Sequence, residues 1–113
     1  MALIEFERRR IDKLLDEFAR RRIPLELKDQ LRLGWRFRGD SVTLWQSRPL
    51  LGAPARWSES NVARFCRDEQ GGWVLHWPDR NGRWHAYEGL EPRRRIEDLL
   101  RVVDDDPTGI FWG

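Results

Sequence analysis

Residues 30–46 read QLRLGWRFRGDSVTLWQ, and this stretch decides the fold. Apolar residues alternate with polar ones on both sides of Gly39–Asp40, the pattern of two strands that each have one apolar face. Gly39–Asp40 itself predicts a two-residue hairpin turn. The turn fixes the pairing so that Trp45 lies across from Gly34, where an aromatic ring can cover the bare backbone. The stretch therefore predicts an antiparallel hairpin.

A helix is expected before the hairpin, at residues 3–22. Its apolar residues recur at the i, i+3, i+4 and i+7 spacing of an amphipathic helix, and Pro24 ends it. After the hairpin, the Pro- and Gly-containing segment 48–61 is expected to be a long connection. Three further strands and a second helix follow, at residues 62–67, 73–78, 83–88 and from Pro92 to about Asp104.

This order predicts a single α+β domain spanning residues 1–113, with an N-terminal helix in residues 1–24. The five strands of residues 25–113 form an antiparallel meander, a C-terminal helix follows, and both helices cover one face of the sheet because their apolar stripes need that cover. The strand residues expected to point toward the helices are Leu33, Trp35, Phe37, Val42, Leu44, Ala63, Phe65, Trp73, Leu75, Trp77, Trp84 and Ala86.

Charges at the helix ends indicate how the helices lie. In a five-strand meander the first and last strands run the same way, so helices packed on them are parallel. Arg20–Arg22 are then expected near Asp104–Asp106. Beyond Pro107, the apolar residues 110–112 are expected to fold back onto the core, because burying each is worth roughly 1.5–3 kcal/mol.

Composition narrows the class of protein. The net charge is +2, and charged residues make up 35% of a chain that contains a single cysteine, Cys66. One cysteine rules out an internal disulfide and fits a reducing compartment, so we expect a cytoplasmic protein. No apolar run approaches the length of a membrane span, and we expect neither a membrane partner nor a cofactor.

The chain resembles a small bacterial family known as domain of unknown function 3024, over residues 25–113. The resemblance rests on the order of several short segments, which are LRLGWRFRGDSVTL, VARFCR, WVLHW, RWHAYE and DDDPTGIFWG. Its most specific parts are Trp84-His85-x-Tyr87 and the closing Asp106-Pro107-x-Gly109-x-Phe111-x-Gly113. Membership implies a compact bacterial domain and supplies no activity, catalytic residue or cofactor. Cys66 and His76 lie outside the pattern.

The second face of the sheet is the candidate functional surface. Arginines there alternate with aromatic residues, which suits single-stranded nucleic acid, since rings stack on bases and guanidinium groups bind phosphates. An acidic protein surface is the other anionic partner that such a face fits. The sequence thus favours a non-enzymatic binding module with no catalytic residues. The residues expected to bind are Arg32, Arg36, Trp45, Arg64, Arg83, His85 and Tyr87.

Two other functions stay open at this point. A four-residue loop at 79–82 would set His76 across from His85, and a bulged turn would bring Cys66 beside them. These three side chains would form a metal site, in a metal-binding protein or a small metal-dependent enzyme. The last alternative is a structural homo-oligomeric domain that pairs through an edge strand.

Overall fold

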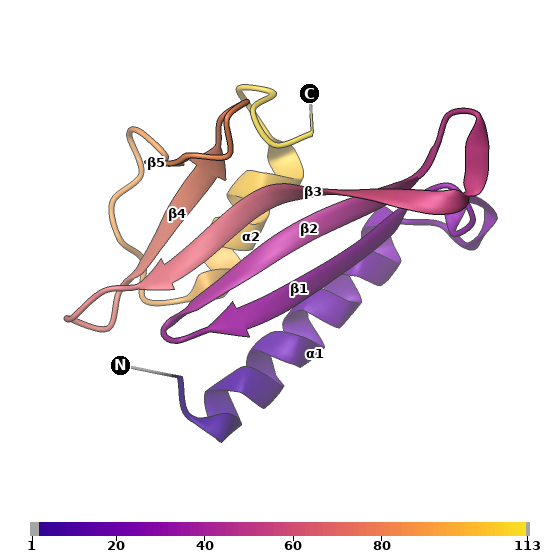
Figure 1. Ribbon diagram of the computed structural model, residues 1–113. Coiled ribbons are helices and arrows are strands. Elements are labelled where there is room, and N and C mark those ends of the chain that lie inside the picture. The colour runs from indigo at the N-terminus through magenta and orange to yellow at the C-terminus, as the bar shows by residue number, and fades with distance from the viewer. Residues whose placement is uncertain (1–2, 113) are drawn as a thin grey trace.

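The computed structural model describes residues 3–112, which form two α-helices and one five-stranded sheet (Figure 1). The elements in chain order are α1 (Glu5–Arg22), the 3₁₀ turn η1 (Leu25–Leu27), β1 (Arg32–Arg38), β2 (Ser41–Leu50), β3 (Ala53–Arg67), β4 (Trp73–Pro78), β5 (Trp84–Ala86) and α2 (Ile96–Asp105). The strands lie in the order β1-β2-β3-β4-β5, and each pairs antiparallel with the next. The predicted α+β meander is confirmed. Neither helix in this part of the chain is long and apolar enough to span a bilayer.

The β1–β2 hairpin has the predicted register. Gly39 has a positive φ of 58° at the first position of the turn, which glycine adopts without strain. Gly34 pairs with Trp45, whose ring lies so close that a Cβ at position 34 would sit 2.1 Å from an indole carbon. The ring therefore covers the glycine backbone, as the sequence predicted.

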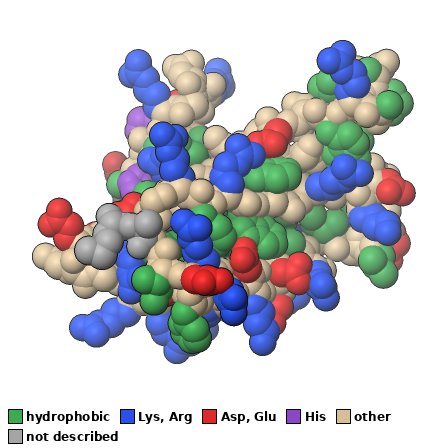
Figure 2. All heavy atoms as spheres, turned by 60° about the horizontal axis from the view of Figure 1, so that its bottom comes forward, with side chains coloured by type: hydrophobic (Ala, Val, Ile, Leu, Met, Phe, Trp, Pro, Cys, Tyr) green, Lys and Arg blue, Asp and Glu red, His purple; other side chains and the backbone are tan. Residues whose placement is uncertain are grey.

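The prediction of a long connection at residues 48–61 is wrong, because β2 and β3 continue through it. The two strands pair as far as Leu50 and Ala53, and the chain reverses at Leu51 and Gly52. We call residues 48–58 the arm. Proline lacks the backbone N–H that would donate a hydrogen bond to the neighbouring strand. Pro49 is tolerated opposite Trp57 because this pair lies near the end of the β2–β3 pairing. The arm projects from the body (Figure 1), and basic and hydrophobic side chains lie together at its end (Figure 2).

A β-bulge at Val62 shifts the register of β3 by one residue. Leu44 pairs with Ala63, whereas the next residue, Trp45, pairs with Asn61, so that Val62 is the extra residue. Val62 and Ala63 are both buried. The bulge therefore reverses the alternation of β3 between the body of the sheet and the arm.

Both helices lie on the same face of the sheet (Figure 1), where they share one hydrophobic core with it. The strand residues buried there include six of those predicted, namely Val42, Leu44, Ala63, Phe65, Trp73 and Leu75. The helices contribute Ile11, Leu15 and Phe18 from α1 and Ile96, Leu99, Leu100 and Val103 from α2. Burial of this apolar surface is the main source of stability.

α2 begins four residues later than predicted. Arg93 is extended and exchanges two backbone hydrogen bonds with Trp73, so the chain joins the sheet edge before the helix starts. The first turn of α2 then carries Glu97 and Asp98, and these acids suit the positive end of the helix dipole.

The C-terminal segment folds back onto the core as predicted. Phe111 is buried and stacks on Tyr87 with 5.6 Å between ring centroids, and Ile110 and Trp112 pack partly buried against the same core. The carboxylate of Asp106 accepts hydrogen bonds from the backbone N–H groups of Phe111 and Trp112 at 3.1 and 3.0 Å. Asp106 thus binds the tail rather than an arginine.

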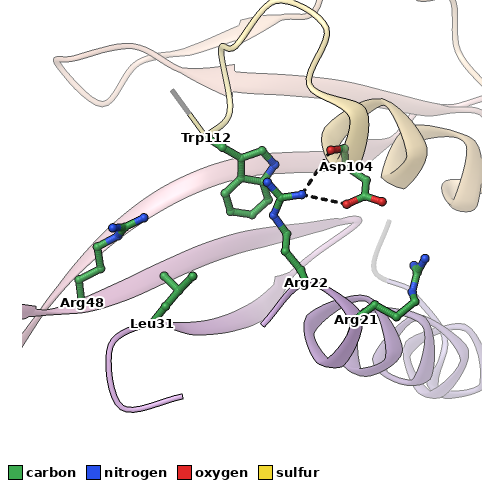
Figure 3. Close-up of a pocket in the computed structure, with 6 residues that line it drawn as sticks. All are labelled: Arg21, Arg22, Leu31, Arg48, Asp104 and Trp112. Atoms are coloured by element: carbon green, nitrogen blue, oxygen red, sulfur yellow. Dashed lines mark hydrogen bonds and ion pairs between the residues drawn. The ribbon is translucent and has the colours of Figure 1, made fainter. Parts of the chain in front are cut away.

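The helices are parallel, and their C-terminal ends meet. Arg22 donates from Nη1 to Asp104 Oδ1 at 2.9 Å, and its guanidinium lies 3.9 Å from the ring centroid of Trp112 (Figure 3). The predicted contact between the arginine end of α1 and the aspartate end of α2 is confirmed through this pair.

Candidate anion-binding face

The face of the sheet opposite the helices carries no covering element in the described chain (Figure 1). Strand register places one residue of each strand in a single row across this open face. The row is Arg36, Thr43, Arg64, His76 and Ala86. Arg36 and Arg64 are two strands apart, or about 10 Å, since neighbouring strands lie about 4.8 Å apart. Their positive charges therefore face the same side.

Three arginines of this open face each lie over a tryptophan. Arg32 lies 3.8 Å from the ring centroid of Trp57, Arg64 lies 4.7 Å from that of Trp84, and Arg36 lies 5.6 Å from that of Trp45. We refer to these six side chains as the Arg–Trp face. The indole rings hold the guanidinium groups electrostatically, while the N–H edges of the guanidinium groups stay available to a ligand.

Two of the six residues, Trp57 and Trp84, were not among those predicted. Trp57 lies in the segment expected to be a loop, and it reaches the open face only because the Val62 bulge reverses the alternation of β3. Trp84 was expected to face the helices, but it points to the open face because of the register of β5. The alternation of apolar and polar residues in the sequence does not reveal the bulge at Val62.

The charge of the Arg–Trp face is mostly uncompensated. Arg36 pairs with Glu59. Within residues 3–112, Arg32 and Arg64 form no ion pair with a carboxylate, and Arg64 Nε is buried without a hydrogen-bond partner. Burial keeps a ligand from Nε of Arg64, so an anion would meet the terminal guanidinium N–H groups of Arg64 and of the exposed Arg32. The face therefore offers donors for an anion.

The predicted register of β4 and β5 is wrong by one residue, because His85 pairs with Trp77 and His76 with Ala86. The cause is Asp79, whose Oδ1 accepts hydrogen bonds from the backbone N–H groups of Asn81 and Arg83. These bonds build a five-residue turn, 79–83, in place of the predicted four-residue loop.

Two of the predicted binding residues consequently lie on the helix side of the sheet, and a third lies outside the strands. His85 stacks on Trp77 with 4.7 Å between centroids on the helix side, and its Nε2 lies 2.7 Å from Asp79 Oδ2. Tyr87 stacks on the core residue Phe111, also on the helix side. Arg83 belongs to the turn before β5 rather than to the strand. Ala86, which was predicted to face the helices, is exposed on the open side.

The same shift separates the three side chains of the proposed metal site. Cys66 pairs with Val74 and His76 with Arg64 on the open face, whereas His85 lies on the helix side. In the described part of the chain, no group of three His, Cys, Asp or Glu side chains is arranged to hold a metal ion. The predicted convergence of Cys66, His76 and His85 is therefore wrong.

Burial and the positive charge of Arg64 shift the pKa values of two neighbouring side chains. Burial lowers the pKa of His76, and the positive charge of Arg64 lowers it further. Burial raises the pKa of the Cys66 thiol, although Arg64 opposes this effect. His76 thus favours the neutral form, and the positive charge in the centre of the row comes from Arg64.

A second basic feature lies where the helices end. A cavity of about 400 Å³ is lined by Arg21, Arg22, Leu31, Arg48, Asp104 and Trp112 (Figure 3). The bond from Arg22 to Asp104 and the hydrogen bond from Trp112 Nε1 to the backbone oxygen of Val103 fix its wall. The C-terminal ends of α1 and α2 also meet here, and their partial negative charges offset part of the charge of the arginines. The Arg–Trp face lies on the other side of the sheet from these helix ends.

Comparison with known proteins identifies one family. A family model described as "Domain of unknown function (DUF3024)" matches residues 3–113, so the match includes the N-terminal helix that the sequence resemblance left out. No curated protein and no solved structure shows significant similarity to the chain.

Proposed function

The chain belongs to the DUF3024 family, and we propose from its surface that it is a non-enzymatic binding module that holds single-stranded nucleic acid on its Arg–Trp face. The observation that supports this most is that three arginines each lie over a tryptophan ring on an uncovered sheet. Guanidinium groups pair with phosphate oxygens, and the flat guanidinium and indole groups offer planes to unpaired bases.

Preorganisation supports an anionic ligand. A guanidinium held on a ring loses less freedom on binding than a free arginine side chain, so more of each contact's free energy becomes affinity. The surface is flat and open, which suits a strand with splayed bases better than a duplex, whose bases are stacked inside. An acidic protein surface would meet the same guanidinium groups, although it would make no use of the flat planes.

We further propose that the protein works in the cytoplasm. The lone cysteine, Cys66, supports this, because domains of this size that are exported into oxidising surroundings commonly carry disulfides. The proposal includes no membrane partner.

Fluorescence anisotropy with labelled mixed-sequence oligonucleotides, single- and double-stranded, tests the nucleic-acid proposal. Three phosphate contacts predict a slope of log affinity against log salt of about −2, or about twentyfold weaker binding at about 200 mM than at about 50 mM salt. The single strand should bind more tightly than the duplex.

The double substitution Arg32→Glu with Arg36→Glu should abolish this binding, because it reverses two of the charges of the face. The matched control is Arg9→Glu with Arg101→Glu, which changes the net charge equally at exposed arginines of α1 and α2. The control should keep most of the affinity. Equal losses in both double variants would show that only net charge matters, and the assignment to this face would fail.

Absence of oligonucleotide binding at low salt would exclude nucleic acid as a general ligand. A labelled polyglutamate peptide then serves as the second probe. Binding of this peptide that is lost in Arg32→Glu with Arg36→Glu would assign the Arg–Trp face to an acidic protein partner instead.

A further inference from the structure

We propose that the end of the arm docks into a cavity at the opposite end of a second copy of this chain, so that the protein associates head to tail. The two surfaces lie at opposite ends of the molecule along its longest dimension of 47 Å (Figure 1). This inference concerns neither the Arg–Trp face nor its ligand.

The end of the arm is apolar and basic. Leu51 at the turn is 102% exposed and its neighbour Leu50 is 40% exposed. Arg56 is exposed near them, and within residues 3–112 it forms no ion pair with a carboxylate, whereas Arg48 lies at the base of the arm and lines the cavity at the helix ends. Figure 2 shows a basic side chain and hydrophobic side chains together on this projection. A fully exposed leucine at a projecting turn is suited to enter a cavity in a partner.

The cavity at the other end is apolar and acidic. It measures about 600 Å³ and is enclosed by the start of α1, the β1–β2 turn and the β3–β4 turn. Leu3 and Ile4 form its apolar wall, and Ile4 is 62% exposed. A volume of this size lies within the roughly 300–1,000 Å³ that binding pockets span. The apolar wall can accept the leucine side chains of an arm.

The charges of the cavity complement those of the arm. Its acidic lining residues are Glu7, Asp40, Asp68 and Glu69, and its one basic lining residue, Arg67, pairs with Glu7. Three negative charges remain without an ion pair in the described chain, and the end of the arm carries one positive charge without one, that of Arg56. Opposite charges around an apolar contact orient the partners and exclude the reverse pairing of like ends.

The contact joins two different surfaces, the arm of one copy and the cavity of the next. Each copy offers one arm and one cavity, so every added copy leaves a free arm at one end and a free cavity at the other. Such a heterologous contact builds open chains unless the rotation between copies closes a ring. The contact is small because a single hairpin end enters the cavity, and we expect a dissociation constant of about micromolar or weaker.

Sedimentation velocity at protein concentrations from about 10 µM to about 1 mM tests the proposal. The weight-average mass should rise above the protomer mass of 13.6 kDa as concentration increases. It should fall again when salt is raised from about 0.05 to about 0.5 M, because salt screens the paired charges. A wild-type protein that remains at the protomer mass over the whole range would overturn the proposal.

Two variants locate the contact. The arm variant, Leu51→Ser with Arg56→Ser, and the cavity variant, Ile4→Lys with Glu69→Lys, change only exposed residues and should each remain monomeric. Arg80→Asp, an exposed charge reversal in the β4–β5 turn, is the control and should associate like the wild type.

Mixing the arm variant with the cavity variant is the decisive measurement. The mixture contains one intact arm and one intact cavity, so it should form a 1:1 dimer with twice the protomer mass and grow no further. A mixture that stays monomeric, or an arm variant that associates as the wild type does, would overturn head-to-tail docking.

Discussion

Gly34 lies in β1 directly under the indole ring of Trp45. The indole ring occupies the space that any side chain at position 34 would need. The ring belongs to the Arg–Trp face through its contact with Arg36, so this glycine supports the surface as well as the hairpin.

Gly34→Ala should lower the free energy of unfolding by about 1–3 kcal/mol, the usual cost of adding a methylene where no room exists. Urea denaturation followed by circular dichroism measures the change. In a Trp45→Ala background the same substitution should cost much less, because the clashing ring is gone. An equal cost in both backgrounds would show that the ring is not the cause.

His76 lies beside Arg64 in the middle of the open face, and its pKa is lowered mainly by burial. The unfolded chain keeps the ordinary histidine pKa of about 6.5. Between the two pKa values the unfolded state binds more protons than the native state. The free energy of unfolding should therefore rise as pH increases through the window that ends near that value.

Replacing His76 with glutamine should remove this part of the pH dependence. The difference in free energy of unfolding between wild type and His76→Gln, measured by urea denaturation from about pH 5 to about pH 7, should change with pH in favour of the wild type at higher pH. A difference that is constant over this range would contradict the lowered pKa.

At the scale of elements, the C-terminal segment depends on Asp106. This residue ends α2 in the left-handed conformation with φ of 43°, and its carboxylate holds two backbone N–H groups of the tail. One residue thus ends the helix and binds the segment that covers the core.

Asp106→Ala should lower the free energy of unfolding by about 2 kcal/mol, because the carboxylate is lost and alanine disfavours a positive φ. Asp106→Gly keeps the backbone conformation accessible and isolates the loss of the carboxylate. In both variants the amides of Phe111 and Trp112 should exchange hydrogen faster. Asp105→Ala, at the exposed neighbour, should leave stability and exchange unchanged.

The number, type and order of the elements could be predicted from the sequence, because alternation and helical periodicity are local signals. The β1–β2 register could also be predicted, since Gly39–Asp40 defines a two-residue turn. The β4–β5 register could not, because it depends on two hydrogen bonds that the Asp79 carboxylate accepts from backbone N–H groups of its own turn. That single difference moved Trp84 onto the open face and His85 off it.

At the scale of the whole molecule, the described chain divides into a body with the hydrophobic core and an arm that extends from it. The residues of the core cluster all lie outside the arm, which spans residues 48–58. The arm therefore contributes little to the stability of the body, although it carries Trp57 of the Arg–Trp face and the proposed docking leucines.

Replacing residues 49–57 with Asn-Gly should leave the body folded, because Arg48 and Ser58 are paired and a two-residue turn can join them. The free energy of unfolding should change by less than about 1 kcal/mol, since the deleted residues lie outside the core. A loss of cooperative urea unfolding would show instead that the arm is part of the folding unit.

The bulge at Val62 separates two stretches of β3 whose alternation between the two faces differs by one residue. On the body side of it, even-numbered residues of β3 such as Arg64 face the open side, whereas Trp57 and Glu59 beyond it do so with odd numbers. Deleting Val62 would let Ala63 follow Asn61 directly, so β3 would pair with β2 as one regular ladder and Trp57 would keep its place on the open side. The segment between Trp57 and Ala63 can therefore lose one residue to a single-codon deletion without turning the arm over, because the ladder has one residue more than a regular pairing needs.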